Sequence, residues 1–344
     1  MKPIEQPYLL YVGDVTDDTF AKTATGIAYW RPESCVGLWR ADQELDHYGL
    51  QSCGFEEAVE RGARTLVVGV APDGGQLPRH WVKELGQALE AGLHLAAGLH
   101  TRLREIPELV AIAAEFDREL HDVRYPEELS LTVGHGEPRS GRRLLTVGTD
   151  CAVGKMFTAL EIERQLQARG LEATFRATGQ TGIFIAGSGI AVDAVVSDFI
   201  SGAAEMLSPA NDANHWDVIE GQGSLFHPAY AGVSLGLLHG SQPDVLVLCH
   251  RVGREHPVGA ETSALPSMPE CIRANEQAAH LTNRAARVVG VSVNTADLGD
   301  GEARRYLAGL EDELGLPVGD PVRTGLESVV DAVVGTLPER IDAG

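Results

Sequence analysis

LLTVGTDCAVGKMFTALEIERQLQ, residues 144–167, decides the fold because it joins an apolar strand, a glycine-bounded loop and a helix. The run Leu144–Val147 is typical of a strand buried on both faces, and apolar residues recur at helical spacing after Lys155. Gly148 and Gly154 let the loop curl with its N–H groups pointing inward, while the helix start and Lys155 add positive charge. Such a loop binds phosphate. An ordinary glycine-bearing turn with an exposed lysine is the alternative.

The loop departs from the common pattern G-x-x-x-x-G-K-[ST] in two ways. It has one more residue between its glycines, and Met156 stands where a hydroxyl would bind Mg²⁺. A thioether is a poor ligand for this hard cation, and Thr158 lies about 200° further round the helix. We therefore expect a phosphate anion without an obligatory metal, so coenzyme A fits at least as well as ATP. The candidate binding residues are Gly148, Thr149, Asp150, Val153, Gly154, Lys155 and Met156.

Length and composition predict a two-domain protein of the cytoplasm. A chain of 344 residues exceeds the size at which one core keeps growing. The 28 basic and 49 acidic residues give a net charge of −21, which disfavours nucleic acid and anionic membranes as partners. Five cysteines without a C-x-x-C pair, and no leader or long apolar run, indicate a reduced, soluble protein. Cys151 lies in the phosphate loop, but the sequence offers it no obvious base, so we favour a packing role.

Strands and helices alternate along the chain, which predicts an α/β fold with parallel strands and right-handed crossovers. Expected strands are 7–15, 35–43, 64–75, 144–147, 173–175, 216–219, 243–251 and 286–295, and expected helices include 55–62, 81–93, 103–120 and 270–284. Residues 121–143 lose apolar periodicity and gather proline, glycine and charge. We therefore expect domains at 1–132 and 144–344, joined by a linker at 133–143.

A second polar loop, ATGQTG at 177–182, follows the strand that ends at Phe175. Hydroxyls and an amide at the carboxyl end of a strand suit a small polar substrate, so Thr178, Gln180 and Thr181 are candidate substrate ligands; a flexible turn is the alternative. Asp198 flanks the next apolar stretch, where it either faces the same cleft or lies on a solvated face.

Glu220 stands at the tip of strand 216–219 and begins the segment EGQG. The GTDxxVGK form of the phosphate loop and this E-G-x-G segment both resemble dethiobiotin synthetase and its P-loop relatives. In that group the glutamate binds Mg²⁺ or positions reacting groups. His227 is a further acid/base candidate, with a structural role as the alternative, and Arg251, at the tip of strand 243–251, is suited to binding an anion through its planar fork.

The whole chain resembles the two-domain bacterial family that includes D-glutamate N-acetyltransferases (DgcN-like proteins). The resemblance rests on RTLVVGVAPDGG and EAGLHLAAGLHTRL in the first half, and on GTDCAVGKM, ATGQTG, EGQGSLFHP and LPVGDPVRTG in the second. It implies a Rossmann-like N-terminal domain, a C-terminal P-loop domain, and acetyl transfer from acetyl-CoA to the amine of a D-amino acid, with D-glutamate as the best candidate.

This resemblance leads to a mechanistic hypothesis. The phosphate loop anchors acetyl-CoA, the polar loop and Arg251 hold the amino acid, and a carboxylate or imidazole takes a proton from its amine. Glu220 is the first candidate for that base, followed by Asp198 and His227. We expect a homo-oligomer without nucleic-acid or membrane partners and without a metal. The alternatives are an ATP- and Mg²⁺-dependent ligase or kinase of the dethiobiotin synthetase type, and a non-catalytic nucleotide-binding module.

Overall fold

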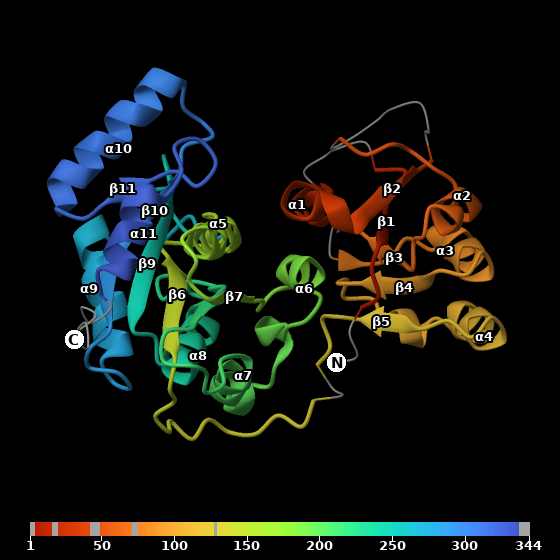
Figure 1. Cartoon of the computed structure of the whole chain (residues 1–344), viewed down its shortest axis with the longest axis horizontal. Coiled ribbons are helices and arrows are strands. Elements are labelled where there is room, and N and C mark those ends of the chain that lie inside the picture. Colours follow the sequence, from red (N-terminus) through yellow and green to blue (C-terminus); the bar gives the residue numbers. More distant parts are fainter. Residues whose placement is uncertain (1–3, 16–19, 42–48, 71–74, 127–128, 337–344) are drawn as a thin grey trace, which may run out of the picture. The chain divides into compact units, whose positions relative to one another are not determined.

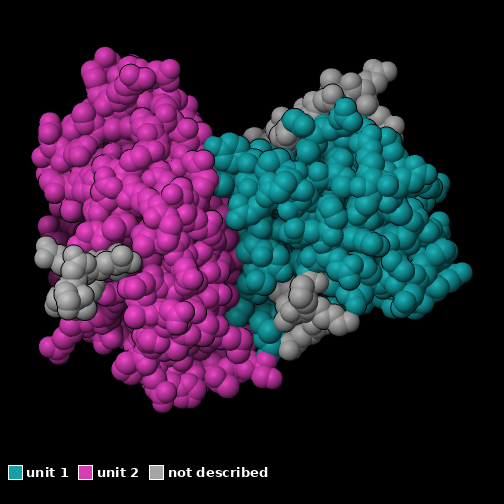
Figure 2. All heavy atoms as spheres, in the orientation of Figure 1, with its two compact units in different colours: residues 1–129, 179–194 teal, residues 130–178, 195–344 magenta. Residues whose placement is uncertain are grey.

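The computed structural model describes residues 4–15, 20–41, 49–70, 75–126 and 129–336. The chain divides into two compact units, shown in different colours in Figure 2. Unit 1 comprises residues 1–129 and 179–194, and unit 2 comprises residues 130–178 and 195–344. The division differs from the continuous second domain expected at 144–344, because residues 179–194 pack with the first unit and the expected linker belongs to the second.

Unit 1 contains a five-stranded, all-parallel sheet with strand order β2-β1-β3-β4-β5. Its elements are β1 (Tyr8–Gly13), α1 (Lys22–Trp30), β2 (Cys35–Arg40), α2 (Phe55–Glu60), β3 (Thr65–Val68), α3 (Trp81–Glu90), β4 (His94–Ala97), α4 (Pro107–Glu115), β5 (Leu120–Asp122) and α6 (Gln180–Ala186). With right-handed crossovers this order places α1 on one face of the sheet and α2, α3 and α4 on the other, as Figure 1 shows.

The prediction of a single helix at 103–120 is wrong. A 3-10 turn at Leu103–Glu105 precedes α4, and β5 follows it. Pro107 begins the helix, and the residue before it, Ile106, has the extended φ of −96° and ψ of 104° that a following proline imposes. The chain turns after α4 at Asp117, which has a φ of 53°. The apolar residues of 103–120 keep helical spacing although the backbone is not one continuous helix, because Pro107 separates the 3-10 turn from α4.

Helix α6 joins unit 1 although its sequence neighbours belong to unit 2. The hydroxyl of Tyr8 donates to the carbonyl of Phe184 at 3.2 Å, and the hydroxyls of Thr23 and Thr181 lie 2.9 Å apart. Gly98 allows the close approach, since a Cβ there would lie 2.5 Å from the Cβ of Gln180. The loop expected at 177–182 is thus a loop only to Gly179, because α6 begins at Gln180.

Unit 2 contains a six-stranded, all-parallel sheet with strand order β11-β10-β9-β6-β8-β7. Its elements are β6 (Arg142–Gly148), α5 (Lys155–Ala168), β7 (Ala173–Arg176), α7 (Ile200–Leu207), β8 (Trp216–Ile219), α8 (Ala231–Ser241), β9 (Val245–Arg251), α9 (Met268–Ala279), β10 (Arg287–Asn294), α10 (Asp300–Leu314), β11 (Val318–Gly319) and α11 (Glu327–Val334). The expected parallel α/β fold is therefore confirmed in both units. Because the strands are parallel, their carboxyl ends meet at one edge of the sheet.

The segment expected to be a linker is fastened to unit 2. The guanidinium of Arg139 donates to the carbonyls of Ser208 and Gly240, both at 2.6 Å, and so caps the ends of α7 and α8. The carboxylate of Glu205 accepts the backbone N–H groups of His135 and Gly136. Among the described residues, no helix is both long enough and apolar enough to span a membrane.

Candidate functional site

The phosphate loop connects β6 to α5 at the centre of the unit 2 sheet. Gly154, with a φ of 98°, precedes the first residue of α5 and adopts a left-handed conformation that favours glycine. A Cβ on Gly148 would lie 2.9 Å from the carbonyl oxygen of Asp150 and 3.0 Å from the Nζ atom of Lys155. Both glycines are thus needed for the tight curl of the loop.

Residues outside the loop hold it in shape. The hydroxyl of Ser224 donates to the carbonyls of Gly148 and Thr149, at 2.9 and 3.0 Å. The hydroxyl of Thr149 lies 3.0 Å from Nδ1 of His250, and its N–H donates to the carbonyl of Cys249. The loop is therefore preorganised from β8 and β9. Sequence reasoning missed Ser224 and His250, although Ser224 lies within the motif EGQGSLFHP.

Lys155 points back into the loop. Its Nζ atom donates to the carbonyl of Asp150 at 2.8 Å, and the side chain is buried, which lowers the pKa of its ammonium group. The hydroxyl of Thr158 is turned away, as expected, because it donates to the carbonyl of Gly154 and lies 2.7 Å from the hydroxyl of Ser292. The loop thus presents a buried cation without the hydroxyl that holds Mg²⁺ in ATPases.

Glu220 is fixed at the tips of three neighbouring strands. Its Oε2 atom accepts the N–H of Thr178 at 2.9 Å, and its carbonyl accepts the hydroxyl of Thr178 at 2.7 Å. The next residue, Gly221, donates its N–H to the hydroxyl of Thr146 at 2.9 Å. The Glu220 side chain is only 5% exposed. Thr178, a predicted substrate ligand, is fully buried; its N–H binds the carboxylate of Glu220, and its hydroxyl binds the main-chain carbonyl of the same residue.

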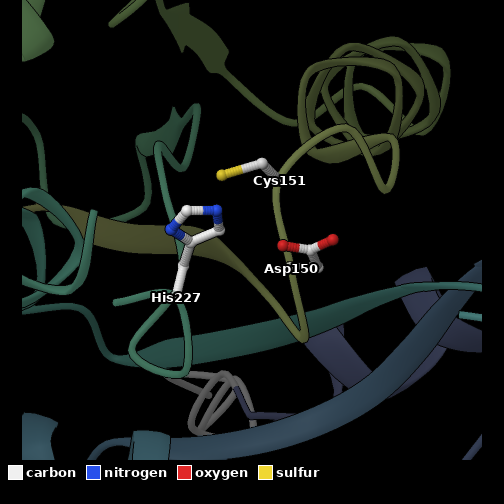
Figure 3. Close-up of side chains that lie close together, drawn as sticks. All are labelled: Asp150, Cys151 and His227. Carbon is white, nitrogen blue, oxygen red and sulfur yellow. The ribbon is translucent and has the colours of Figure 1, made fainter. Parts of the chain in front are cut away.

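Asp150, Cys151 and His227 form a compact cluster, in which one potential ligand atom from each lies within 4.8 Å of the others (Figure 3). Nε2 of His227 lies 2.9 Å from the carbonyl of Val258, and its Nδ1 accepts the N–H of Ala229 at 3.1 Å. Nε2 is therefore protonated, and the one lone pair of the ring is already used. In this arrangement His227 serves neither as a general base nor as a metal ligand.

The segment after β9 closes over Asp150. The Oδ2 atom of Asp150 accepts the N–H of Val258 at 3.0 Å and lies 3.2 Å from Nη1 of Arg254. Its Oδ1 atom is buried and has no hydrogen-bond partner among the described residues. A buried acceptor without a donor is costly, so this oxygen is suited to an N–H or O–H group of a ligand.

Two cavities adjoin these residues. One of about 580 Å³ is lined by residues 251–259, Glu261 and Asp297. The other, of about 380 Å³, is lined by Val153, Gly154, Phe157, Asn294, Ala296 and residues 320–323, and thus shares Gly154 with the phosphate loop. Both volumes fall in the range of small-molecule sites.

The other predicted site residues are Arg251, Asp198, Gln180 and Thr181. Arg251 forms two hydrogen bonds to the carboxylate of Asp297, at 2.9 and 3.0 Å, at the rim of the larger cavity. Asp198 is exposed on the 3-10 turn that precedes α7. Gln180 and Thr181 belong to unit 1. The structure therefore brings the phosphate loop, Thr178, Glu220 and His227 together in unit 2, whereas within that unit Arg251 pairs with Asp297 and Asp198 is exposed.

We expect His250 to make unit 2 less stable in acid. Burial, with a contribution from Arg254, lowers the pKa of His250 from its usual value near 6.5 to about 4. The unfolded chain then binds the proton more readily, so the free energy of unfolding falls by about 3 kcal/mol as the pH drops from 7 to 4. Urea unfolding at several pH values measures this loss. A His250→Asn variant should lose less stability over the same range; an unchanged pH dependence would contradict the assignment.

Comparisons with known proteins agree with this architecture. Residues 132–330 match a family model described as the domain of unknown function DUF1611_C, a P-loop domain, and residues 41–126 match DUF1611_N, a Rossmann-like domain. The crystal structure of a DUF1611 family protein from Anabaena variabilis superposes with a TM-score of 0.85 at 36% identity, covering 96% of this chain and 100% of that one. The predicted pairing of a Rossmann-like and a P-loop domain is therefore confirmed.

Two relatives also match over nearly their full lengths. A D-glutamate N-acetyltransferase of Tritonibacter scottomollicae is 49% identical over 330 residues, which cover 96% of this chain and 99% of that protein. A D-glutamate N-acetyltransferase of a Pseudoalteromonas species is 47% identical over 327 residues, which cover 95% of this chain and 98% of that protein. The family resemblance inferred from the sequence motifs is confirmed by these matches.

Proposed function

The chain belongs to the DUF1611 family, and on that premise we propose that it is a D-glutamate N-acetyltransferase with acetyl-CoA as the acetyl donor. The observation that carries the proposal is an identity of 47–49% with two D-glutamate N-acetyltransferases over at least 95% of this chain. The geometry supports it, because the phosphate loop offers a buried cation but, at Met156, no hydroxyl for the metal that ATP chemistry needs.

In this proposal the loop N–H groups and Lys155 bind the diphosphate of coenzyme A. The Nζ atom of Lys155, now bonded to the carbonyl of Asp150, forms the charge-assisted contact. The loop needs little rearrangement because Ser224 and His250 already hold it. The 380 Å³ cavity beside Gly154 takes the adenosine end, with Phe157 and apolar side chains against the base.

The acceptor amine is an ammonium ion at neutral pH and must lose a proton before it attacks. Glu220 takes that proton, and Oδ1 of Asp150 offers the ammonium group an acceptor. The amine nitrogen then bonds to the thioester carbonyl carbon and releases its second proton to water, backbone N–H groups stabilise the oxyanion, and the C–S bond breaks. The departing thiolate receives the proton from Glu220. In this proposal Arg251 and Arg254, which line the 580 Å³ cavity, bind a carboxylate of the amino acid, whereas roles for Gln180, Thr181 and Asp198 stay predictions.

An assay with purified full-length chain tests the function. Incubation with acetyl-CoA and D-glutamate should release free coenzyme A thiol and form N-acetyl-D-glutamate, and added EDTA should leave the rate unchanged. L-glutamate and other D-amino acids provide the specificity comparison. Formation of ADP from ATP and Mg²⁺, without thiol release from acetyl-CoA, would overturn the proposal in favour of a ligase or kinase. Light scattering on the same sample tests the proposed homo-oligomer.

We expect transfer to be direct, without an acetylated cysteine. Burial raises the pKa of the Cys151 thiol, and the neighbouring His227 has both ring nitrogens engaged. A Cys151→Ser variant should therefore keep kcat within about threefold of the wild-type value. If the reaction went through an acetylated cysteine, the serine variant would turn over far more slowly. Steady-state kinetics measure this, with intact mass spectrometry after mixing with acetyl-CoA alone. A gain of one acetyl group on Cys151, with loss of turnover in the variant, would establish the covalent route.

A further inference from the structure

The cavity beside the phosphate loop combines apolar walls with one cationic side chain. Val153 and Phe157 line it from the loop and α5, and Pro321 and Val322 line it from the segment after β11. Among the described residues that line it, Arg323 carries the one positive charge. In a chain with a net charge of −21, a cation beside a small-molecule cavity is suited to a negatively charged part of its ligand.

The backbone that carries Arg323 is rigidly held. Oδ1 of Asp320 accepts the N–H groups of Val322 and Arg323, at 2.9 and 3.0 Å. Oδ2 of Asp320 accepts the N–H and the hydroxyl of Thr295, at 2.9 and 2.6 Å, which ties the segment to the end of β10. All four donors surround a carboxylate that is only 4% exposed. The backbone of Arg323 is therefore held in place beside the cavity.

The guanidinium itself is incompletely satisfied. Its Nη1 atom is buried and, within the described part of the chain, has an ion-pair partner but no hydrogen bond. It lies 3.0 Å from Oδ1 of Asp300, but that side chain is 83% exposed, whereas the Arg323 side chain is 25% exposed. An ion pair with an exposed carboxylate contributes little, and a phosphate group offers a guanidinium a stronger, two-point contact. Asp300 is therefore a partner that an incoming phosphate can displace.

We propose that Arg323 binds the 3′-phosphate of coenzyme A, the group that distinguishes this carrier from ATP and ADP. The inference rests on the proposed function, because it requires that the adenosine end of coenzyme A occupies the cavity beside Gly154. Lys155 and the loop N–H groups then bind the diphosphate, and Arg323 binds the 3′-phosphate, the second anionic group, on the far side of the ribose. Arg323 is thus a specificity-determining residue for the donor.

Calorimetric titration of the full-length protein with coenzyme A and with 3′-dephospho-coenzyme A tests this assignment. Wild-type protein should bind coenzyme A roughly 10- to 100-fold more tightly than the dephospho form, as expected for one charge-assisted contact. Arg323→Gln should lose that difference, with an unchanged Kd for the dephospho form. Arg323→Lys should keep part of it. Arg304→Gln, which removes an exposed arginine of α10, is the matched control and should behave as wild type.

Three results would overturn the proposal. They are equal affinity of wild-type protein for the two compounds, an equal loss of affinity for both in Arg323→Gln, and an unchanged preference in that variant. If coenzyme A binds with the expected preference but no acetyl group is transferred to D-glutamate, the proposed function fails while the role of Arg323 stands.

Discussion

Replacing Glu220 with glutamine is expected to lower kcat by about 10²- to 10⁴-fold, which is the usual contribution of a general base. The amide keeps the shape of the side chain and an oxygen that accepts the N–H of Thr178, now 2.9 Å from Oε2. It has no lone pair basic enough to take a proton from the acceptor ammonium. The loss should therefore fall on kcat, while the Kd for coenzyme A at the phosphate loop changes little.

Steady-state kinetics and calorimetry on the same preparations separate these two effects. The acid limb of the pH profile of kcat/KM, which reports ionisation of the base in the free enzyme, should disappear in Glu220→Gln. Asp198→Asn, which changes the second candidate base, is the informative comparison: because Asp198 is exposed on its turn, this variant should lose less kcat than Glu220→Gln. If Glu220→Gln retained full turnover with an unaltered pH profile, the base would have to be sought elsewhere.

Replacing Gly221 with alanine is expected to destabilise unit 2 by at least about 3 kcal/mol. A Cβ at this position would lie 1.7 Å from the carbonyl oxygen of Thr146 and 3.0 Å from Cδ of Lys155. The first of these atoms belongs to the backbone of the central strand β6 and has no room to move. Relief of the clash would also break the bond from the N–H of Gly221 to the hydroxyl of Thr146.

Chemical denaturation, followed by fluorescence of the fully buried Trp216 in β8, measures this loss. Gly232→Ala is the matched control, because a Cβ at Gly232, in α8, would meet no atom within 4 Å. Alanine in a helix is better than glycine by up to about 1 kcal/mol, so the control should be neutral or slightly stabilising. Equal midpoints for the two variants would show that the strand accommodates the extra methyl group.

The parts of the fold that could be predicted from the sequence are those that depend on residues adjacent in the chain. The phosphate loop was recognisable because a buried strand, two glycines, Lys155 and an amphipathic helix are contiguous. Glu220 was recognisable because it follows a short apolar strand and precedes a glycine. In both cases the residues that form the feature are consecutive in the chain, so the feature can be recognised from a single sequence.

Contacts between distant residues were beyond that reasoning. Thr178 resembled a substrate ligand because it follows a strand, yet its N–H and hydroxyl both bond to Glu220, 42 residues later. His227 resembled an acid/base group until Val258 and Ala229 were found on its two nitrogens. Arg323 lies in the motif LPVGDPVRTG, which suggests no role for it, because the cavity beside it forms only when β10 and the segment after β11 meet the phosphate loop.

The route of the chain through α6 also has a consequence for synthesis on the ribosome. The hydroxyl of Tyr8 is fully buried, and its acceptor, the carbonyl of Phe184, is translated 176 residues later. Unit 1 therefore stays incomplete until β6, α5 and β7 have already been made, so the usual order, in which the N-terminal domain finishes folding before the next one emerges, does not apply. Expressing residues 1–129 by themselves should consequently yield a chain that lacks one of its own helices.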